Sequence, residues 1–130
     1  MWATARVRNL RPQEPIPAEF QIGFDALGQL DYNWIWVVED RGIEGILVAA
    51  PCHGLALLYR VQMRPGSKLL MRLLRSVMKD LRARGIRGFM TFLSQRREEE
   101  IKLGIIIERL GGRQMGEHMV MASPLAKEGV

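Results

Sequence analysis

The chain has 130 residues, of which 48% are hydrophobic and 25% are charged, and this composition is typical of one folded domain with its own core. Its formal net charge of +5 makes phosphorylated ligands, nucleic acids or acidic protein surfaces plausible partners. The only cysteine, Cys52, excludes an intrachain disulfide and a cysteine-based zinc site, and it favours a cytoplasmic location. No uncharged run reaches the roughly 20 residues that a membrane helix needs, so we expect no membrane insertion.

The first third of the chain predicts an edge strand, a loop and a short helix. From Thr4 to Leu10, the set Ala5, Val7 and Asn9 alternates with the set Arg6, Arg8 and Leu10. This period of two favours a strand at the edge of a sheet. Three prolines between Arg11 and Pro17 allow only a loop there. The segment from Ala18 to Leu30 then predicts a short helix, whose buried side consists of Phe20, Ile22, Phe24 and Leu27.

An antiparallel meander of three strands follows. Its first strand, Asn33 to Glu39, is packed with aromatic and β-branched residues, which favour a pleated and buried setting. Turn residues at 40–42 lead into a strand from Ile43 to Ala50, and a second turn at 51–54 leads into a strand from Leu55 to Met63.

A long amphipathic helix comes after Pro65-Gly66. Ser67 is suited to cap it, so we expect the helix to begin at Lys68 and to end before Gly85. Its apolar residues recur at helical spacing and predict a buried side made of Leu70, Leu73, Leu74, Val77, Met78 and Leu81. The cations at the same spacing cover roughly 80° of the opposite side: Lys68, Arg72, Arg75, Lys79 and Arg82.

The last third predicts a strand from Ile86 to Leu93, a helix from about Arg97 to Leu110, and a final strand from Met115 to Ala122. A helix between two strands implies a right-handed crossover, so the strands on either side of it run parallel. The predicted fold class is therefore α+β. It consists of a mixed, mostly antiparallel sheet of about six strands, flanked by helices, with one parallel βαβ crossover. We expect a single domain over residues 1–130, with a core at about 5–122 and a tail at 123–130.

This order of elements resembles the GNAT family of N-acetyltransferases, and the resemblance covers the chain from about Ala5 to Ala122. In that family a strand ending in a valine leads through a glycine-rich loop into a long helix, whose N-terminus binds the pyrophosphate of acetyl-coenzyme A (acetyl-CoA). A second, local similarity lies at residues 107–112, Ile-Glu-Arg-Leu-Gly-Gly, which look like the family's Tyr-Glu-Lys-Leu-Gly-Phe segment. The resemblance implies a divergent GNAT member that binds acetyl-CoA. The implied cofactor-binding residues are Val61, Met63, Arg64, Gly66, Ser67 and Lys68.

The usual catalytic groups of the family are replaced in this sequence. Leu57 and Leu58 stand where the family often has a carboxylate that acts as general base, and Ile107 stands where a tyrosine often protonates the leaving thiolate. Tyr59 and Glu44 are the candidate catalytic residues for proton transfer. The histidines, His53 and His118, are further candidates for proton transfer, but two histidines so far apart predict no metal site.

Two functions from different classes remain open. The first is an acetyl-CoA-dependent N-acetyltransferase that acts on an amine of a small molecule or a protein, and whether the enzyme is active stays uncertain. The second is a catalytically degenerate GNAT-like domain that serves in a larger assembly, for example a phage particle, or as a homo-oligomer. The basic side of the long helix also admits nucleic acid as a partner, although a solvated outer face is favoured because that side has no aromatic residue for base stacking.

Overall fold

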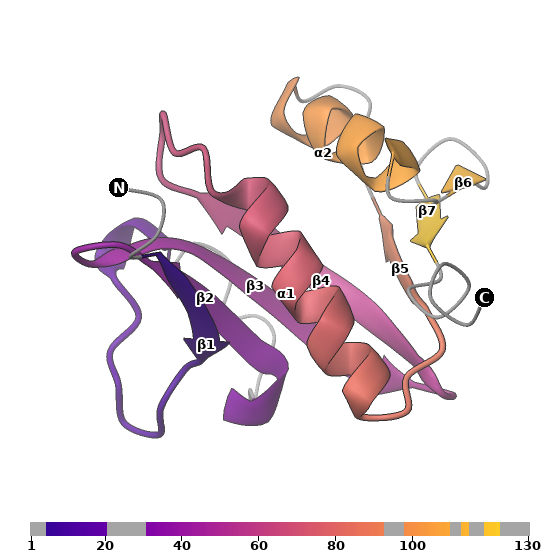
Figure 1. Ribbon diagram of the computed structural model, residues 1–130, viewed down its shortest axis with the longest axis horizontal. Coiled ribbons are helices and arrows are strands. Elements are labelled where there is room, and N and C mark those ends of the chain that lie inside the picture. Colours follow the sequence, from indigo (N-terminus) through magenta and orange to yellow (C-terminus); the bar gives the residue numbers. More distant parts are fainter. Residues whose placement is uncertain (1–4, 21–30, 93–97, 110–112, 115–118, 123–130) are drawn as a thin grey trace. The chain divides into compact units, whose positions relative to one another are not determined.

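The computed structural model describes residues 5–20, 31–92, 98–109, 113–114 and 119–122 (Figure 1). The contacts divide the chain into two compact units: Met1–Ala49 with Arg60–Val77, and Ala50–Tyr59 with Met78–Val130. The described strands form a seven-stranded sheet in the order β1-β2-β3-β4-β5-β7-β6. None of the described helices is both long enough and apolar enough to span a membrane.

The sheet of the first unit begins with three antiparallel strands. They are β1 (Arg6–Asn9), β2 (Ile35–Glu39) and β3 (Ile43–Cys52), and β1 lies at the edge as predicted. Val7 lies opposite Val38, and Val37 lies opposite Ile46. Because successive side chains of a strand point to opposite faces, this register gives the unit two separate apolar faces.

One face of these strands packs against the proline-containing loop and the short 3₁₀ helix η2 (Ala18–Phe20). Phe20 is 1% exposed and belongs to one buried cluster with strand residues of that face. Burying a phenylalanine of this kind stabilises the fold by about 2 to 3 kcal/mol. The cluster consists of Leu10, Phe20, Ile35, Val37, Ile46 and Val48, with Ile16 and Ile43 packed against it.

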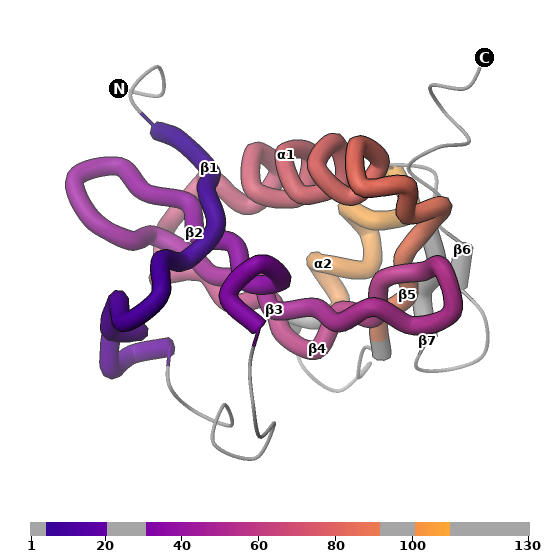
Figure 2. Tube along the Cα trace, turned by 90° about the horizontal axis from the view of Figure 1, so that it is seen from below, coloured from indigo at the N-terminus to yellow at the C-terminus, as the bar shows by residue number. Residues whose placement is uncertain are grey.

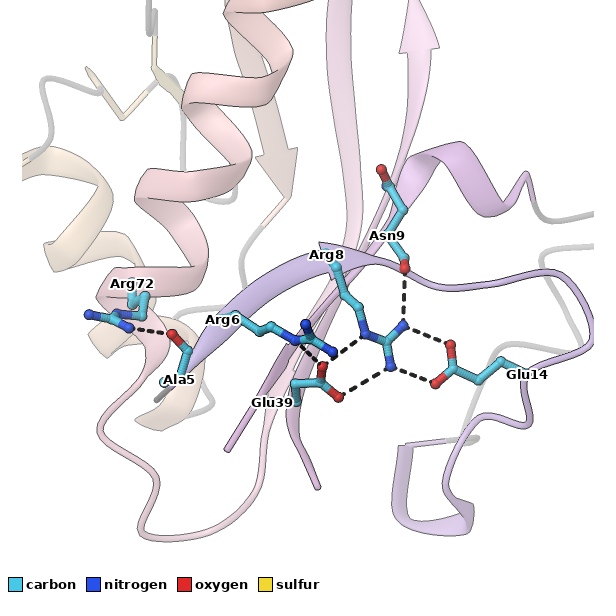
Figure 3. Close-up of polar contacts among 7 residues, drawn as sticks. All are labelled: Ala5, Arg6, Arg8, Asn9, Glu14, Glu39 and Arg72. Carbon is cyan, nitrogen blue, oxygen red and sulfur yellow. Dashed lines mark hydrogen bonds and ion pairs between the residues drawn. The ribbon is translucent and has the colours of Figure 1, made fainter. Parts of the chain in front are cut away.

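An ion-pair network joins β1, β2 and the loop between them (Figure 3). Arg8 binds Glu14 with two parallel bonds, Nη1–Oε1 at 2.8 Å and Nη2–Oε2 at 2.7 Å. Its Nε also donates to Glu39 at 3.1 Å, and Arg6 Nε donates to the same Glu39 oxygen at 2.6 Å. The hydrogen bonds to Arg8 hold the pKa of Glu14 at about 2, well below its ordinary value, and also lower the pKa of Glu39. Because the Arg8–Glu14 contact is bidentate, the network fixes the loop to β1 in one specific geometry.

The next strand and helix contain residues of both units. β4 (Leu55–Met63) follows a two-residue turn at 53–54, where both residues have positive φ as in a type I′ hairpin. α1 (Leu70–Ala83), the longest described helix in the tube of Figure 2, buries Leu73 and Leu74 completely. Its C-terminus is closed by Gly85, at φ +84°, in a Schellman motif whose two bonds are Ile86 N to Leu81 O and Gly85 N to Arg82 O.

In the second unit, the sheet continues from the first half of β4 with one parallel pair of strands and then antiparallel pairs. β5 (Phe89–Phe92) runs parallel to β4, with Ala56 opposite Phe89 and Leu58 opposite Thr91. Thr91 is the buried polar residue of this region, and its Oγ1 donates to the Leu58 carbonyl at 3.2 Å. β7 (Met119–Ala122) pairs antiparallel with β5, and the two-residue strand β6 (Arg113–Gln114) pairs with β7. The parallel crossover that the sequence predicts is therefore confirmed.

The second helix of this unit, α2 (Glu98–Arg109), lies against β6 and β7. Leu103 and Ile107 form its buried side, whereas Ile101 and Ile105 remain exposed. Ile107 is completely buried and belongs to the core of this unit.

The mixed α+β fold with a parallel crossover is confirmed, but several predicted bounds are wrong. The predicted strand at Asn33 begins at Ile35, because Asp31 caps a 3₁₀ turn, η4 (Tyr32–Trp34), by accepting from Asn33 N–H. The strand predicted to end at Ala50 continues to Cys52. The sheet has seven described strands, which agrees with the prediction of about six; the additional one, β6, is too short to leave a periodic signal. Of the helix predicted at 18–30, only Ala18–Phe20 is described, and the predicted tail at 123–130 lies outside the described residues.

Candidate cofactor site

The candidate site is the junction between β4 and α1, which lies in the first unit. Arg64, Pro65, Gly66 and Ser67 form a β-turn closed by a hydrogen bond of 3.0 Å from Ser67 N to Arg64 O. Proline at the second position and a glycine with φ +81° at the third are the pattern of a type II turn. Apart from Gly66 and its two chain neighbours, no described residue has an atom within 4 Å of the position that a Cβ of Gly66 would occupy, so the turn is not packed against the described part of the chain there.

The N-terminus of α1 differs from the prediction by two residues. The helix begins at Leu70 and not at Lys68, and the first helical bond runs from Leu73 N to Leu69 O at 2.9 Å. Ser67 Oγ accepts from Leu69 N at 3.3 Å, so the serine stabilises the turn that precedes the helix. The N–H groups of the first helical turn have no carbonyl four residues earlier within the helix and can bind an anion.

Lys68 is exposed beside this first turn and is the cation best placed to meet an anion there. Arg72 and Arg75 are also exposed on the first half of α1, and Arg72 donates to the Ala5 carbonyl. Farther along the helix, Lys79 is exposed and Arg82 is half-buried. Nucleic-acid binding by these cations stays a prediction.

Arg64 is engaged by two carboxylates. Its Nε and Nη2 donate to Glu19 Oε1 at 2.9 and 2.6 Å, and its Nη1 donates to Glu44 Oε2 at 2.9 Å. The hydrogen bonds that Arg64 donates to Glu19 are the main reason that the pKa of Arg64 is raised. Arg64 and Glu44, two residues that the sequence assigns to different roles, are therefore brought together as an ion pair.

Glu19 is a residue of this site that the sequence did not indicate. It lies on η2, and its backbone carbonyl accepts from Gln62 Nε2 at 2.9 Å. Its neighbour Phe20 is anchored in the core, so Glu19 is held from two sides. The separation of 45 residues between Glu19 and Arg64 leaves no periodic or local signal that could have found the contact.

Met63 and Val61 have half-buried side chains at the end of β4. The Met63 side chain packs over Gly45 of β3, because a Cβ added at Gly45 would overlap Met63 Sδ and lie 2.7 Å from its Cε. The thioether of Met63 therefore packs against β3. Met63 can serve the predicted cofactor site only through its backbone.

The backbone also joins the turn to β3. Arg64 N–H donates to the Glu44 carbonyl at 2.7 Å, so the first residue of the turn is held beside the start of β3.

The remaining candidates for proton transfer are distributed over the chain. The side chain of Tyr59 is 51% exposed on β4, and His53 is exposed in the turn with φ +52°. His118 lies outside the described residues. Leu58 is buried, so the position at which the family often has a carboxylate is part of the core here. Among the described residues, no three His, Cys, Asp or Glu side chains come together as metal ligands.

No protein-family profile matches the sequence, and no curated protein sequence matches it. Solved structures do match the fold. An IAA acetyltransferase from Bacillus cereus superimposes with a TM-score of 0.75 at 10% identity, over 92% of this chain and 99% of that one. An acetyltransferase of the GNAT family from Staphylococcus aureus gives a TM-score of 0.68 at 11% identity, over 92% and 99%. The PaiA N-acetyltransferase from Thermoplasma acidophilum, in complex with coenzyme A, gives 0.55 at 15% identity, over 67% and 57%.

These likenesses agree with the element order, the parallel β4–β5 pairing and the β4–turn–α1 junction. Because the sequence identities are so low, the substrates of these proteins are not assigned to this chain. The agreement over nearly the whole length nevertheless identifies the architecture. The chain has the GNAT fold, in a divergent sequence.

Proposed function

We propose that this chain binds acetyl-CoA at the β4–turn–α1 junction and transfers the acetyl group to an amine. The observation that supports this proposal is the strand, type II turn and helix at 55–83, set within a fold that acetyltransferases share. The hydrogen-bond donors and the positive charge at this junction are also suited to an acyl-CoA. Unpaired N–H groups at the start of α1 and the exposed Lys68 are complementary to a diphosphate.

Bound acetyl-CoA would supply an acetyl thioester, whose carbonyl carbon is attacked by the amine while the carbon–sulfur bond breaks. We assign stabilisation of the charge on the carbonyl oxygen to backbone N–H groups at the end of β4, near Val61 and Met63. The exposed hydroxyl of Tyr59 is the candidate donor of a proton to the leaving thiolate. Glu44 is a weaker candidate for general base, because Arg64 Nη1 already binds its carboxylate.

The reactive amine must be neutral when it attacks, and β4 itself contains no aspartate or glutamate that could remove its proton. Positioning of both reactants can supply much of the rate without a dedicated base. We therefore expect the reaction to accelerate as pH rises toward the pKa of the amine substrate. The acceptor belongs to the broad class of primary amines, on a small molecule or on a protein.

Calorimetry with coenzyme A tests the binding step, with Lys68→Glu and Lys79→Glu as a matched pair. Both substitutions reverse one exposed charge of the same helix region, but only Lys68 adjoins the first turn of α1. We expect Lys68→Glu to weaken binding by about fivefold or more, and Lys79→Glu to change it by less than about twofold. Equal effects of the two variants, or no binding at millimolar coenzyme A, would contradict the proposed site.

Release of free thiol from acetyl-CoA, measured with and without a panel of amines, tests the transfer step. The expected result is thiol release that depends on the amine, together with one acetyl group added to the amine in the mass spectrum. A protein that binds coenzyme A but transfers nothing to any amine would favour the alternative, in which a GNAT-like domain has lost catalysis.

A further inference from the structure

Glu19 and the candidate cofactor compete for the same partner. Arg64 stands at the first position of the turn that leads into α1, and three of its side-chain nitrogens already contact carboxylates. An arginine whose donors are taken by acidic side chains is a poor ligand for a phosphate, because the same N–H groups are needed for both. Glu19 occupies the edge of the guanidinium formed by Nε and Nη2, so that contact must break before this edge can bind an anionic ligand.

The two carboxylates hold Arg64 in different ways. Glu44 lies on β3, and its backbone carbonyl accepts from Arg64 N–H, so the two residues remain neighbours whatever their side chains do. Glu19 lies on η2 and contacts Arg64 through its carboxylate, with Oε1 accepting from both Nε and Nη2. The side chains of Glu19 and Arg64 are 50% and 42% exposed, so water can replace this contact at low cost.

Charge adds to the competition. One guanidinium and two carboxylates have a net charge of −1 beside the turn, where a diphosphate would add further negative charge. Release of Glu19 would leave Arg64 paired with Glu44 alone and would free its Nε and one of its Nη2 hydrogens. These hydrogens lie on one edge of the guanidinium and match two oxygens of a phosphate.

We propose that Glu19 is an internal competitor for the phosphate-binding edge of Arg64, and that a bound phosphate group of coenzyme A displaces it. This inference rests on the proposed function. Glu19 then determines affinity without contacting the ligand, because it determines how often Arg64 is available. The hydrogen bond from Gln62 to the Glu19 backbone keeps the displaced carboxylate close, so the contact can re-form when the ligand leaves.

The test compares coenzyme A with pantetheine, which lacks the phosphates, in the wild-type chain and in Glu19→Gln. We expect Glu19→Gln to bind coenzyme A about threefold to tenfold more tightly, since an exposed ion pair no longer has to break. Pantetheine affinity should not change, and the gain for coenzyme A should shrink as salt is raised. Glu108→Gln, which removes one exposed acid from α2, is the charge-matched control and should show no gain.

A double-mutant cycle with Arg64→Met supplies the second readout. Arg64→Met should change coenzyme A affinity little in the wild-type chain but should abolish the whole gain in the Glu19→Gln chain. Two results would refute the competition and leave the proposed function standing. In the first, the wild type binds coenzyme A and Glu19→Gln binds it no more tightly. In the second, Glu19→Gln gains as much affinity for pantetheine as for coenzyme A. If neither chain binds coenzyme A, both fail. Binding by Glu19→Gln alone would support both.

Discussion

The guanidinium of Arg72, on α1, donates a hydrogen bond to the backbone carbonyl of Ala5, just before β1 (Figure 3). The two residues are 67 positions apart. In the β1–β2 register, Leu10 N–H points to β2 and bonds the Ile35 carbonyl, so alternate residues Ala5, Val7 and Asn9 point their backbone groups away from β2. Arg72 therefore satisfies an acceptor at the open edge of the sheet.

Arg72→Met should lower the free energy of unfolding by about 1 kcal/mol, because the Ala5 carbonyl loses a charged donor. Methionine retains the aliphatic part of the side chain, so the loss reports on the guanidinium. Urea denaturation measures the change. Arg75→Met, also exposed on α1, is the control, and an equal cost for the two variants would show that the Ala5 bond contributes nothing.

Glu14→Gln should flatten the loss of stability in acid. The pKa of the Glu14 carboxyl is about 2 in the folded chain, against an ordinary value of 4.5, so the unfolded chain binds more protons between these values. The stabilisation from Glu14 is therefore present above about pH 4.5 and is lost as pH falls toward about 2. The lowered pKa of Glu39 acts in the same direction.

We expect Glu14→Gln to lose about 1 to 2 kcal/mol of stability at neutral pH and to lose less than the wild type on acidification. Urea denaturation at a series of pH values gives both quantities. Glu108→Gln should retain the wild-type slope, since Glu108 is exposed on α2. Parallel pH profiles for Glu14→Gln and wild type would refute the role of the Arg8 ion pair.

Gly45→Ala should destabilise the chain by about 1 to 2 kcal/mol, because the new Cβ meets the Met63 side chain and lies 3.2 Å from Val38 Cγ1. The Met63 part of this cost should disappear when Met63 is shortened. We therefore expect Gly45→Ala to cost clearly less in a Met63→Ala chain than in the wild type. Strict additivity of the two substitutions in urea denaturation would show that the overlap is relieved elsewhere.

Gly66→Ala should cost about 1 kcal/mol through the backbone alone, since Gly66 has φ +81° and no described residue beyond its chain neighbours packs against the position of its missing Cβ. Asparagine tolerates this conformation better than alanine does, so Gly66→Asn should cost less. Thermal unfolding of the two variants compares them directly. A greater loss for asparagine would mean that side-chain volume at the turn matters more than φ.

Features that depend on neighbouring residues were predictable from the sequence. The end of α1 at Gly85 follows from the ability of glycine to adopt positive φ and is confirmed. Helical spacing predicted the apolar side of α1, of which Leu73, Leu74, Val77 and Leu81 are buried, whereas Leu70 and Met78 are half-buried. The pairing of β2 with β3 followed from two runs of strand residues separated by a glycine-containing turn. The start of α1 was displaced by two residues, because Ser67 stabilises a turn and does not cap the helix itself.

The candidate site was only partly predictable. The sequence placed Arg64, Gly66 and Ser67 together because they are adjacent in one turn. It could not pair Arg64 with Glu19, since that contact joins a loop segment to a distant strand end and follows no period. The packing of Met63 over Gly45 was equally hidden, because it depends on the register of β3 against β4.

Within the described ranges, β1 is the edge strand of the sheet, and arginine side chains bind outward carbonyls at its ends. Arg8 Nη1 donates to the Asn9 carbonyl at 3.2 Å, as Arg72 does to the Ala5 carbonyl, so both ends of this short edge already have charged donors (Figure 3). A foreign strand that adds here must displace two guanidinium groups before it completes its own ladder of bonds. Growth of the sheet into a fibril from this edge therefore begins with a barrier.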